Sequence, residues 1–485
     1  MPLISPHANT IPLLAPSDKL LVIKYRMSGP GANVNSTDAV TKYITVVVSK
    51  FITSVLKSFY SFRCADANIL GDDTVKAIVN GRVIVPCHEG NFVAKNRWCI
   101  IFDDRIRAVG SMPKDNDELD AYEFYDDNVL RKANVPDDAI DADAFNDVSD
   151  ADVIDAGGMF VAPGFINVHI HGCAGADVMD ASPAALSTIR NYLPSTGVTS
   201  FLPTTMTMPL INIYAALKNI RRAMKFNEGA KILGANLEGP FISEKFCGAQ
   251  DKKNILRADF NLIEPFADVL KIITVAPEEL SALSFISECR SRGIIVSIGH
   301  SAADCQTVMN AFAYGARNIT HLFNAQTGLH HRRPGIVGAA LASHAVVELI
   351  ADNVHIDPVV QKIVSKAKPS AEIILITDSL RACGCGDGVF DLGGQRVTVK
   401  GTLATLDDGT IAASVAPMNE VVKNFWLNSG WAIENVIESV TKTPAVELEI
   451  YDRLGSLEVG KAADIVIFDD ALDIHSVFVD GEPIL

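Results

Sequence analysis

Eight short apolar runs follow one another through the middle of the chain, and polar segments with helical periodicity separate most of them. The runs are residues 161–168, 199–204, 231–237, 270–276, 294–298, 317–320, 346–351 and 372–377. Continuous apolar runs of this length are typical of parallel strands that are buried on both faces. Because strands alternating with helices form parallel sheets, eight repeats predict a (β/α)8 barrel of the TIM type, an α/β fold.

A second set of segments, before and after the barrel in the sequence, alternates apolar with polar positions. These segments are residues 74–86, 97–110, 388–404, 455–469 and 474–485, and glycine-rich turns connect them. A period of two predicts strands with one solvated face. We expect them to join in a small β-sandwich domain built from residues before and after the barrel. The predicted division is 73–113, 381–412 and 451–485 for this β domain, 153–380 for the barrel and 413–450 for helices that return to it.

Two stretches fit neither pattern. Residues 1–72 are expected to be an N-terminal extension that is poorly ordered, with a targeting segment as the alternative. Residues 114–152 are rich in aspartate, and such a run predicts a solvated insertion. Calcium binding is the sharper alternative for this tract, but its carboxylates lack the spacing of an EF-hand loop.

Ionisable residues stand directly after six of the eight runs. They are His169 and His171 after the first run, Glu238 after the third, His300 after the fifth, His321 after the sixth, His355 after the seventh and Asp378 after the eighth. The C-terminal ends of the strands form the active-site face of such a barrel. We therefore expect these side chains to meet in one mouth.

The residue types in this set favour a metal centre. Two histidines and one carboxylate with an open fourth position form a catalytic zinc arrangement, which Glu238, His300 and His321 could supply. His169 and His171 point to the same side of a strand, so they could complete a second metal position. A divalent ion brings the pKa of bound water towards neutrality, which makes hydroxide available as a nucleophile. Asp378 could take a proton from that water and return it to a leaving nitrogen.

Seven motifs carry a family resemblance. In order they are PGFINVHIHG, GANLEGPFIS, TVAPE, SIGHS, THLFNA, ADNVH and ITDS, and together with GSLEVGKAADIVIFD they resemble the N-acetylglucosamine-6-phosphate deacetylases of the amidohydrolase superfamily. The resemblance spans residues 75–485 except the acidic tract. It implies a metal-dependent hydrolase that cleaves the acetamide of N-acetylglucosamine 6-phosphate to glucosamine 6-phosphate and acetate. It implies one or two divalent ions, with Zn²⁺ as the first expectation and Fe²⁺, Mn²⁺ or Co²⁺ as alternatives.

The same resemblance assigns roles to individual residues. Glu238, His300 and His321 match the principal metal ligands, and Asp378 matches the general base and acid. The substrate-binding matches are Ala249, Gln250, Asn324, Ala325, Arg332, His355, Ile411, Ala412 and Ala413. Arg332 falls at the position of a phosphate-contacting arginine that often reaches across a dimer interface, so a homodimer is expected.

Three positions depart from the family pattern. Gln250 stands where a histidine often orients the acetamide, and an amide can donate a hydrogen bond but cannot titrate at ordinary pH. Asn167 stands where an aspartate is usual, which could weaken the support of His169 and His171. Ala413 stands where glycine is common.

Composition limits which partners and which cellular compartment are expected for this protein. Apolar residues make up 48% of the chain and charged residues 21%, a balance typical of soluble globular proteins. The net charge of −16 argues against nucleic acid or an anionic membrane as the main partner. The early apolar run 44–56 is short and interrupted by Lys50, so no membrane span is predicted. Nine cysteines without CxxC pairs indicate reduced thiols and a cytoplasmic protein.

Three alternatives stay open at this point. Cys383 and Cys385 could be a metal or redox pair, although loop cysteines are the simpler interpretation because no further cysteines lie nearby in the sequence. A dihydroorotase-like cyclic amidase would carry a carboxylated lysine after the fourth strand, where this chain has TVAPE. A non-catalytic binding relative would be expected to have lost metal ligands, and this chain retains them all.

Overall fold

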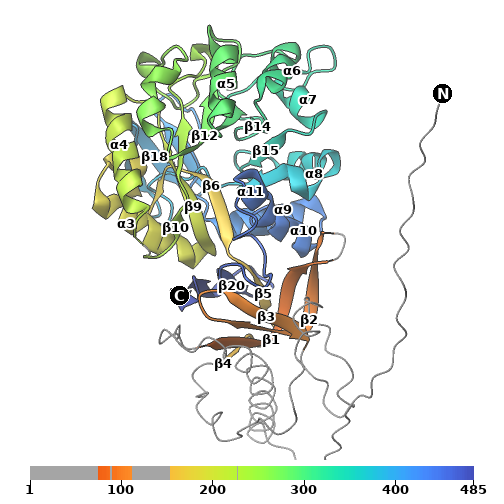
Figure 1. Cartoon of the computed structure of the whole chain (residues 1–485). Coiled ribbons are helices and arrows are strands. Elements are labelled where there is room, and N and C mark those ends of the chain that lie inside the picture. Colours follow the sequence, from red (N-terminus) through yellow and green to blue (C-terminus); the bar gives the residue numbers. More distant parts are fainter. Residues whose placement is uncertain (1–74, 88–89, 112–152, 227) are drawn as a thin grey trace, which may run out of the picture.

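The computed structural model describes residues 75–87, 90–111, 153–226 and 228–485 (Figure 1). Eight parallel strands form a barrel, as predicted: β6 (Phe165–Ile170), β9 (Val198–Thr205), β11 (Ala235–Glu238), β12 (Leu270–Val275), β13 (Ile295–Ile298), β14 (Asn318–Ile319), β15 (Val346–Leu349) and β16 (Ile373–Leu375). Each strand pairs with the next one along the chain. The amide of Asp378 donates to the carbonyl of His169 over 3.0 Å, which brings the last strand to the first and nearly closes the barrel.

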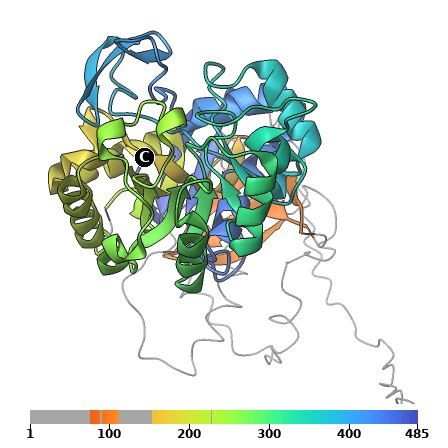
Figure 2. The same ribbon diagram turned by 90° about the horizontal axis from the view of Figure 1, so that it is seen from above.

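Helices surround this barrel (Figures 1 and 2). They are α3 (Pro183–Tyr192), α4 (Leu210–Ala223), α5 (Ala282–Ser291), α6 (Cys305–Tyr314), α7 (Gly335–Leu341) and α8 (Pro358–Ala367), followed by α9 (Met418–Ser429), α10 (Ile433–Glu438) and α11 (Lys442–Glu447). Ser182, Asp304 and Asp357 each accept a backbone hydrogen bond at the start of a helix, as N-cap residues do. Helices α9 to α11 occupy the range that was expected to return to the barrel, and α9 packs against α8.

The interior of the barrel is apolar below its polar mouth. One buried cluster joins side chains from five barrel strands with residues of and just after α11: Ile166, Leu202, Ile272, Ile295, Ile374, Leu448 and Leu454. Burial of these residues supports the strands from the N-terminal end, so the polar residues at the other end rest on a packed base.

A separate sheet lies beside the barrel (Figure 1). It contains β1 (Lys76–Pro86), β2 (Phe92–Phe102), β3 (Ile106–Ser111), β4 (Val153–Asp155), β5 (Phe160–Pro163), β20 (Ile465–Phe468), β21 (Ile474–Val479) and β22 (Glu482–Pro483). The order is β22-β21-β20-β5-β1-β2-β3, and β4 pairs with β1. Segments from before and after the barrel therefore join in one sheet.

The first apolar run is divided between the two sheets. Its beginning is β5, which pairs with β1 and β20, whereas its end is β6 of the barrel. The chain passes from one sheet to the other at Gly164, where a Cβ would collide with the Thr199 side chain. The barrel thus begins after residue 163 and not at residue 153. The pattern could not show this because both halves are equally apolar.

Residues 381–412 do not join the small sheet, so this part of the predicted division is wrong. They contain β17 (Gly388–Leu392), β18 (Gln395–Lys400) and β19 (Leu403–Leu406), which form a sheet of their own. Its apolar side packs on Met206, Leu380 and Ala412 at the mouth of the barrel. The ribbon of this sheet is seen from above in Figure 2. Each strand pairs with its neighbour in sequence, which alternation alone cannot distinguish from pairing with a distant strand.

The expectations for residues 1–72 and for the acidic tract 114–152 fall outside the described residues. Within the described ranges, no helix has the length and apolar character needed to cross a membrane.

Candidate active site

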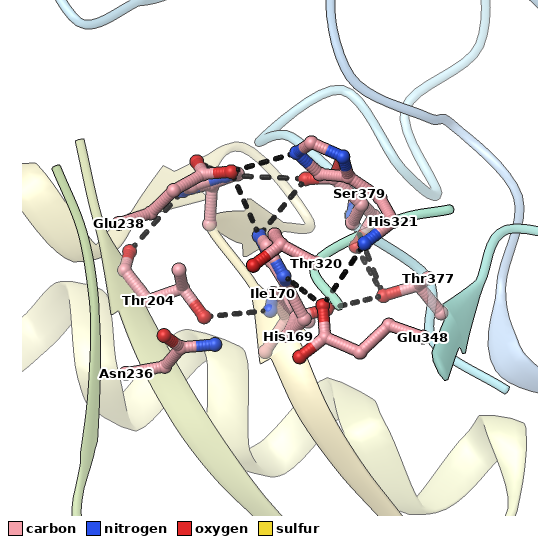
Figure 3. A network of polar contacts seen from close by, with 12 residues as sticks. His169, Ile170, Thr204, Asn236, Glu238, Thr320, His321, Glu348, Thr377 and Ser379 are labelled. Carbon is pink, nitrogen blue, oxygen red and sulfur yellow. Dashed lines mark hydrogen bonds and ion pairs between the residues drawn. The ribbon is translucent and has the colours of Figure 1, made fainter. Parts of the chain in front are cut away.

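Glu238, the last residue of β11, is the centre of the polar mouth. Its side chain is 2% exposed, and the Nε2 atoms of four histidines face its carboxylate. Figure 3 shows His169 and His321 near Glu238. The nitrogen–oxygen distances are 3.0 Å for His321, 3.1 Å for His300, 3.1 Å for His171 and 3.5 Å for His169. The structure therefore brings together the predicted ligands from the ends of the first, third, fifth and sixth strands.

The ligand atoms divide into two groups of three. One group is Glu238, His300 and His321, the other is His169, His171 and Asp378, and in each the three atoms lie within 4.8 Å of one another. The two Nε2 atoms of His300 and His321 are only 3.0 Å apart. A zinc ion about 2.0–2.1 Å from each nitrogen fits between atoms at that separation. In addition, the buried Nε2 of His169 makes no hydrogen bond to any residue that the structure describes. The donor set therefore fits one or two divalent cations.

Three of the imidazole rings are held by their other nitrogen. Nδ1 of His169 lies 2.9 Å from Glu348 Oε2, Nδ1 of His300 lies 3.0 Å from the Cys247 carbonyl, and Nδ1 of His171 lies 3.2 Å from the Thr204 carbonyl. These oxygens can only accept, so each Nδ1 carries a hydrogen and each Nε2 is the nitrogen left to bind a cation. Such outer contacts orient the ligands of metal sites.

The charges of the cluster call for a cation. Burial would raise the pKa of Glu238, but the surrounding histidines, His169 first, hold it well below its usual range. Burial would lower the pKa of His171, but Asp378 and Glu238 raise it to about 9. Without a metal the site therefore retains protons on its histidines. A divalent ion would supply the same positive charge.

Three of the converging residues have a left-handed backbone. The φ angle is +45° at His300, +28° at His321 and +47° at Asp378. Residues with a Cβ rarely adopt this region, and such strained positions cluster at functional sites. Ala413 also has a positive φ, of +56°, which explains why glycine would suit its position.

Gln250 contacts a metal ligand. Its Nε2 donates to Glu238 Oε2 over 2.7 Å, and its Oε1 accepts from the Thr207 amide over 2.7 Å. The residue is 5% exposed. Its contacts thus favour orientation of the Glu238 carboxylate, a role that its predicted place among the substrate ligands did not include. The neighbouring Ala249 is partly buried, and its carbonyl accepts a hydrogen bond from Gln395 of β18.

Other predicted substrate residues lie on loops that join the cluster. Asn324 donates to the His321 carbonyl over 3.3 Å. His355 Nδ1 lies 2.7 Å from Asp352 Oδ2, which also accepts from Ser414 Oγ over 2.9 Å. The Ser414 amide donates to the Asp378 carbonyl over 2.9 Å. The His355 loop and the segment before Ser414 are therefore tied to the backbone of Asp378.

The remaining predicted residues differ in their placement. Ala325 follows Asn324 with a φ of +50°, Ala412 is buried, and Ile411 is 41% exposed. Arg332 lies in an exposed loop, where its Nη1 is 2.8 Å from His331 Nε2, and the structure does not bring it into the cluster. Cys383 and Cys385 belong to neither ligand group, and burial raises the pKa of Cys383 to about 12.

Asn167 supports the strand that carries His169 but does not contact the His169 ring. The Asn167 Nδ2 donates to Thr377 Oγ1 over 2.8 Å, and its Oδ1 accepts from the His169 amide over 3.3 Å. The carboxylate behind the His169 ring belongs to Glu348, which the sequence analysis missed. The sequence does contain a signal for this role, because Glu348 is a charged residue in the middle of the apolar run 346–351.

Comparison with known proteins gives a consistent result. The amidohydrolase family matches residues 160–484. An N-acetylglucosamine-6-phosphate deacetylase of Bacillus subtilis is 43% identical over 323 residues, which cover 64% of this chain and 81% of that protein. An N-acetylgalactosamine-6-phosphate deacetylase of Escherichia coli O157:H7 is 35% identical over 328 residues, 66% of this chain and 87% of that protein.

A solved structure agrees with these relatives. The crystal structure of N-acetylglucosamine-6-phosphate deacetylase from Pasteurella multocida superposes with a TM-score of 0.73 at 26% identity, covering 84% of this chain and 99% of that chain. With the matched barrel and the two ligand groups at its mouth, the chain belongs to the amidohydrolase family, and within it to the N-acetylglucosamine-6-phosphate deacetylase group.

Proposed function

We propose that this protein hydrolyses the acetamide of N-acetylglucosamine 6-phosphate to glucosamine 6-phosphate and acetate. The observation that carries the proposal is the convergence of two buried ligand groups on Glu238, at the strand ends of a barrel whose relatives bear the name of this activity. Neither group would be needed by a binding protein that recognises the sugar alone.

We assign the principal metal position to Glu238, His300 and His321. Two imidazoles and a carboxylate suit Zn²⁺ first, and Fe²⁺, Mn²⁺ and Co²⁺ accept the same donors. When bound, the divalent ion polarises the acetyl carbonyl and lowers the pKa of a coordinated water.

Asp378 is assigned the proton transfers. Burial would raise the pKa of its carboxyl, but His169 and His171 hold it below the usual value, so the carboxylate is ionised at neutral pH. It accepts a proton from the attacking water as the oxygen–carbon bond forms. It then gives the proton to the amide nitrogen as the carbon–nitrogen bond breaks, and the amine leaves neutral.

The sugar phosphate is assigned to the loops around Asp378. Asn324, Ala325 and His355 line one side, and residues 411–413 cover the sugar. In a homodimer, Arg332 of one subunit would reach the phosphate of the substrate bound in the other subunit. This role accounts for its exposed position here. A guanidinium and an imidazole are suited to a phosphate dianion.

The compartment assigned to this enzyme is the cytoplasm. The eight cysteines within the described residues are all free thiols, and five of them are buried. Thiols persist in reducing compartments.

The cyclic-amidase alternative is less well supported. A carboxylated lysine would have to follow β12, where the chain reads Ala276-Pro277-Glu278. Glu238 at the end of β11 occupies the centre of the cluster in place of that lysine.

A second candidate substrate, N-acetylgalactosamine 6-phosphate, has direct support from one relative, since an N-acetylgalactosamine-6-phosphate deacetylase is 35% identical.

Acetate release tests these assignments. We expect kcat/KM for N-acetylglucosamine 6-phosphate to exceed that for N-acetylglucosamine by at least about 100-fold, because donors built for a charged group are left unpaired without it. N-acetylgalactosamine 6-phosphate serves as the epimer control, and a higher kcat/KM for it would transfer the assignment to the second candidate. Equal values with and without the phosphate would refute the phosphate assignment.

A further inference from the structure

Glu348 is a buried carboxylate whose role is not explained by the proposed reaction steps. It lies within β15 and is 0% exposed. Its Oε2 is 2.9 Å from His169 Nδ1 and 3.3 Å from the backbone nitrogen of His321, while its Oε1 makes no hydrogen bond. Burying a carboxylate costs free energy unless a cation or sufficient donors compensate it. A compensating charge is therefore expected nearby.

The described residues supply no permanent cation to this carboxylate. Within the described ranges, the hydrogen-bond partners of Glu348 are the His169 ring and the His321 amide, and no lysine or arginine pairs with it. Together with Glu238 and Asp378 it places three carboxylates in one cluster, and metal binding requires that the imidazoles beside them be neutral. A single divalent ion would then leave a net negative charge in a buried site. A second divalent ion would more than compensate that charge.

The geometry connects Glu348 to the second ligand group through His169. Figure 3 shows the His169 ring between the carboxylates of Glu238 and Glu348. Because Glu348 holds Nδ1, Nε2 points the other way, 3.5 Å from Glu238 Oε1 and 3.5 Å from Asp378 Oδ1, without a hydrogen bond. The same Oε2 also holds the backbone of His321, a ligand of the first group. One oxygen thus connects both groups.

We propose that Glu348 is a positioning residue that makes His169 a metal ligand and thereby gives the site its second metal position. It acts by orienting the ring and by adding the negative charge that a second cation balances. The proposal rests on the metal centre of the proposed function. It does not depend on which substrate is hydrolysed.

Two substitutions separate orientation from charge. Glu348→Gln keeps an oxygen that can accept from His169 and His321 but removes the charge, whereas Glu348→Leu removes both. Glu438→Gln is the matched control, because Glu438 is a carboxylate of similar burial, 2% exposed, that bonds to Ser370 and Lys442 away from the ligand groups. Each full-length protein is stripped with a chelator and titrated with Co²⁺ by calorimetry, and bound cobalt is counted after gel filtration.

We expect two Co²⁺ ions per chain in the wild type and in Glu438→Gln. The affinity for the second ion should fall at least about 10-fold in Glu348→Gln and further in Glu348→Leu, since loss of an outer contact typically costs 10- to 100-fold in metal affinity. The first ion should be retained, and its cobalt absorption spectrum would report an intact first group.

Two results would overturn the proposal: a wild type that binds a single ion, or a Glu348→Gln protein that binds the second ion with wild-type affinity. If Glu348→Leu does not fold, Glu348→Gln alone decides. A wild type that takes up two ions but releases no acetate would count against deacetylation and would leave the role of Glu348 standing.

Discussion

The two ligand groups at the barrel mouth have the same size but are built differently. His169 lies on β6 and His171 directly follows this strand, and Asp378 follows the neighbouring β16 with a left-handed φ of +47°. Glu238, His300 and His321 come from three other strand ends, and two of the three have a left-handed φ. Two ligands of the second group thus come from one strand end, whereas the three ligands of the first group come from three different strand ends.

The outer contacts of the two groups differ as well. Glu238 is oriented by the Gln250 amide and His300 by a backbone carbonyl, so these two ligands of the first group have neutral partners. His169 is oriented by the Glu348 carboxylate, which adds charge to the second group. We infer that the first group defines the position of the principal ion. The second group adjusts the net charge beside that ion and the number of protons that the neighbouring side chains bind.

The largest expected effect follows from replacing Asp378 with asparagine. Asparagine keeps the size of the side chain but cannot accept and return a proton, so turnover should fall on the order of 10²- to 10⁴-fold. The ion at Glu238, His300 and His321 should remain, as measured by metal analysis of the purified variant. Unchanged turnover would remove Asp378 from the mechanism, and loss of both ions would show that the two groups are not separable.

A smaller effect is expected from Gln250→Leu, which probes the first group. Removing the amide leaves Glu238 Oε2 without its 2.7 Å donor, so affinity for the principal ion should fall about 10- to 100-fold. KM for the substrate, measured at saturating metal, should change little. A large rise in KM with unchanged metal affinity would instead restore Gln250 to the substrate ligands.

The smallest effect is a count of the protons released when the site takes up metal. The pKa of His171 in the metal-free site is about 9, so this ring is protonated at pH 7.5 and must lose its proton when it binds a cation. Metal uptake at pH 7.5 should therefore release a proton from His171, and this release should diminish as the pH rises through 9. Calorimetry in two buffers of different ionisation enthalpy measures it. Identical heats in both buffers would contradict the assignment.

The sequence predicted the barrel and the converging ligands because both depend on local features. Buried parallel strands are continuous apolar runs, and a polar residue directly after a run must lie at the mouth. The hydrogen bonds that orient the ligands could not be predicted because they join distant segments. Glu348 and His169, for example, are 179 residues apart. Likewise, the switch of sheets at Gly164 and the separate sheet β17–β19 depend on which strands pair, and alternation of polarity does not specify the partner.

The central claim is that the two ligand groups form one hydrolytic metal centre. Acetate release from N-acetylglucosamine 6-phosphate, measured on chelator-treated protein as Zn²⁺ or Co²⁺ is restored, tests it most directly. We expect no release without metal and a rate that rises with occupancy of the Glu238, His300 and His321 position. Release at the full rate by metal-free protein, or none at any metal content, would contradict the account.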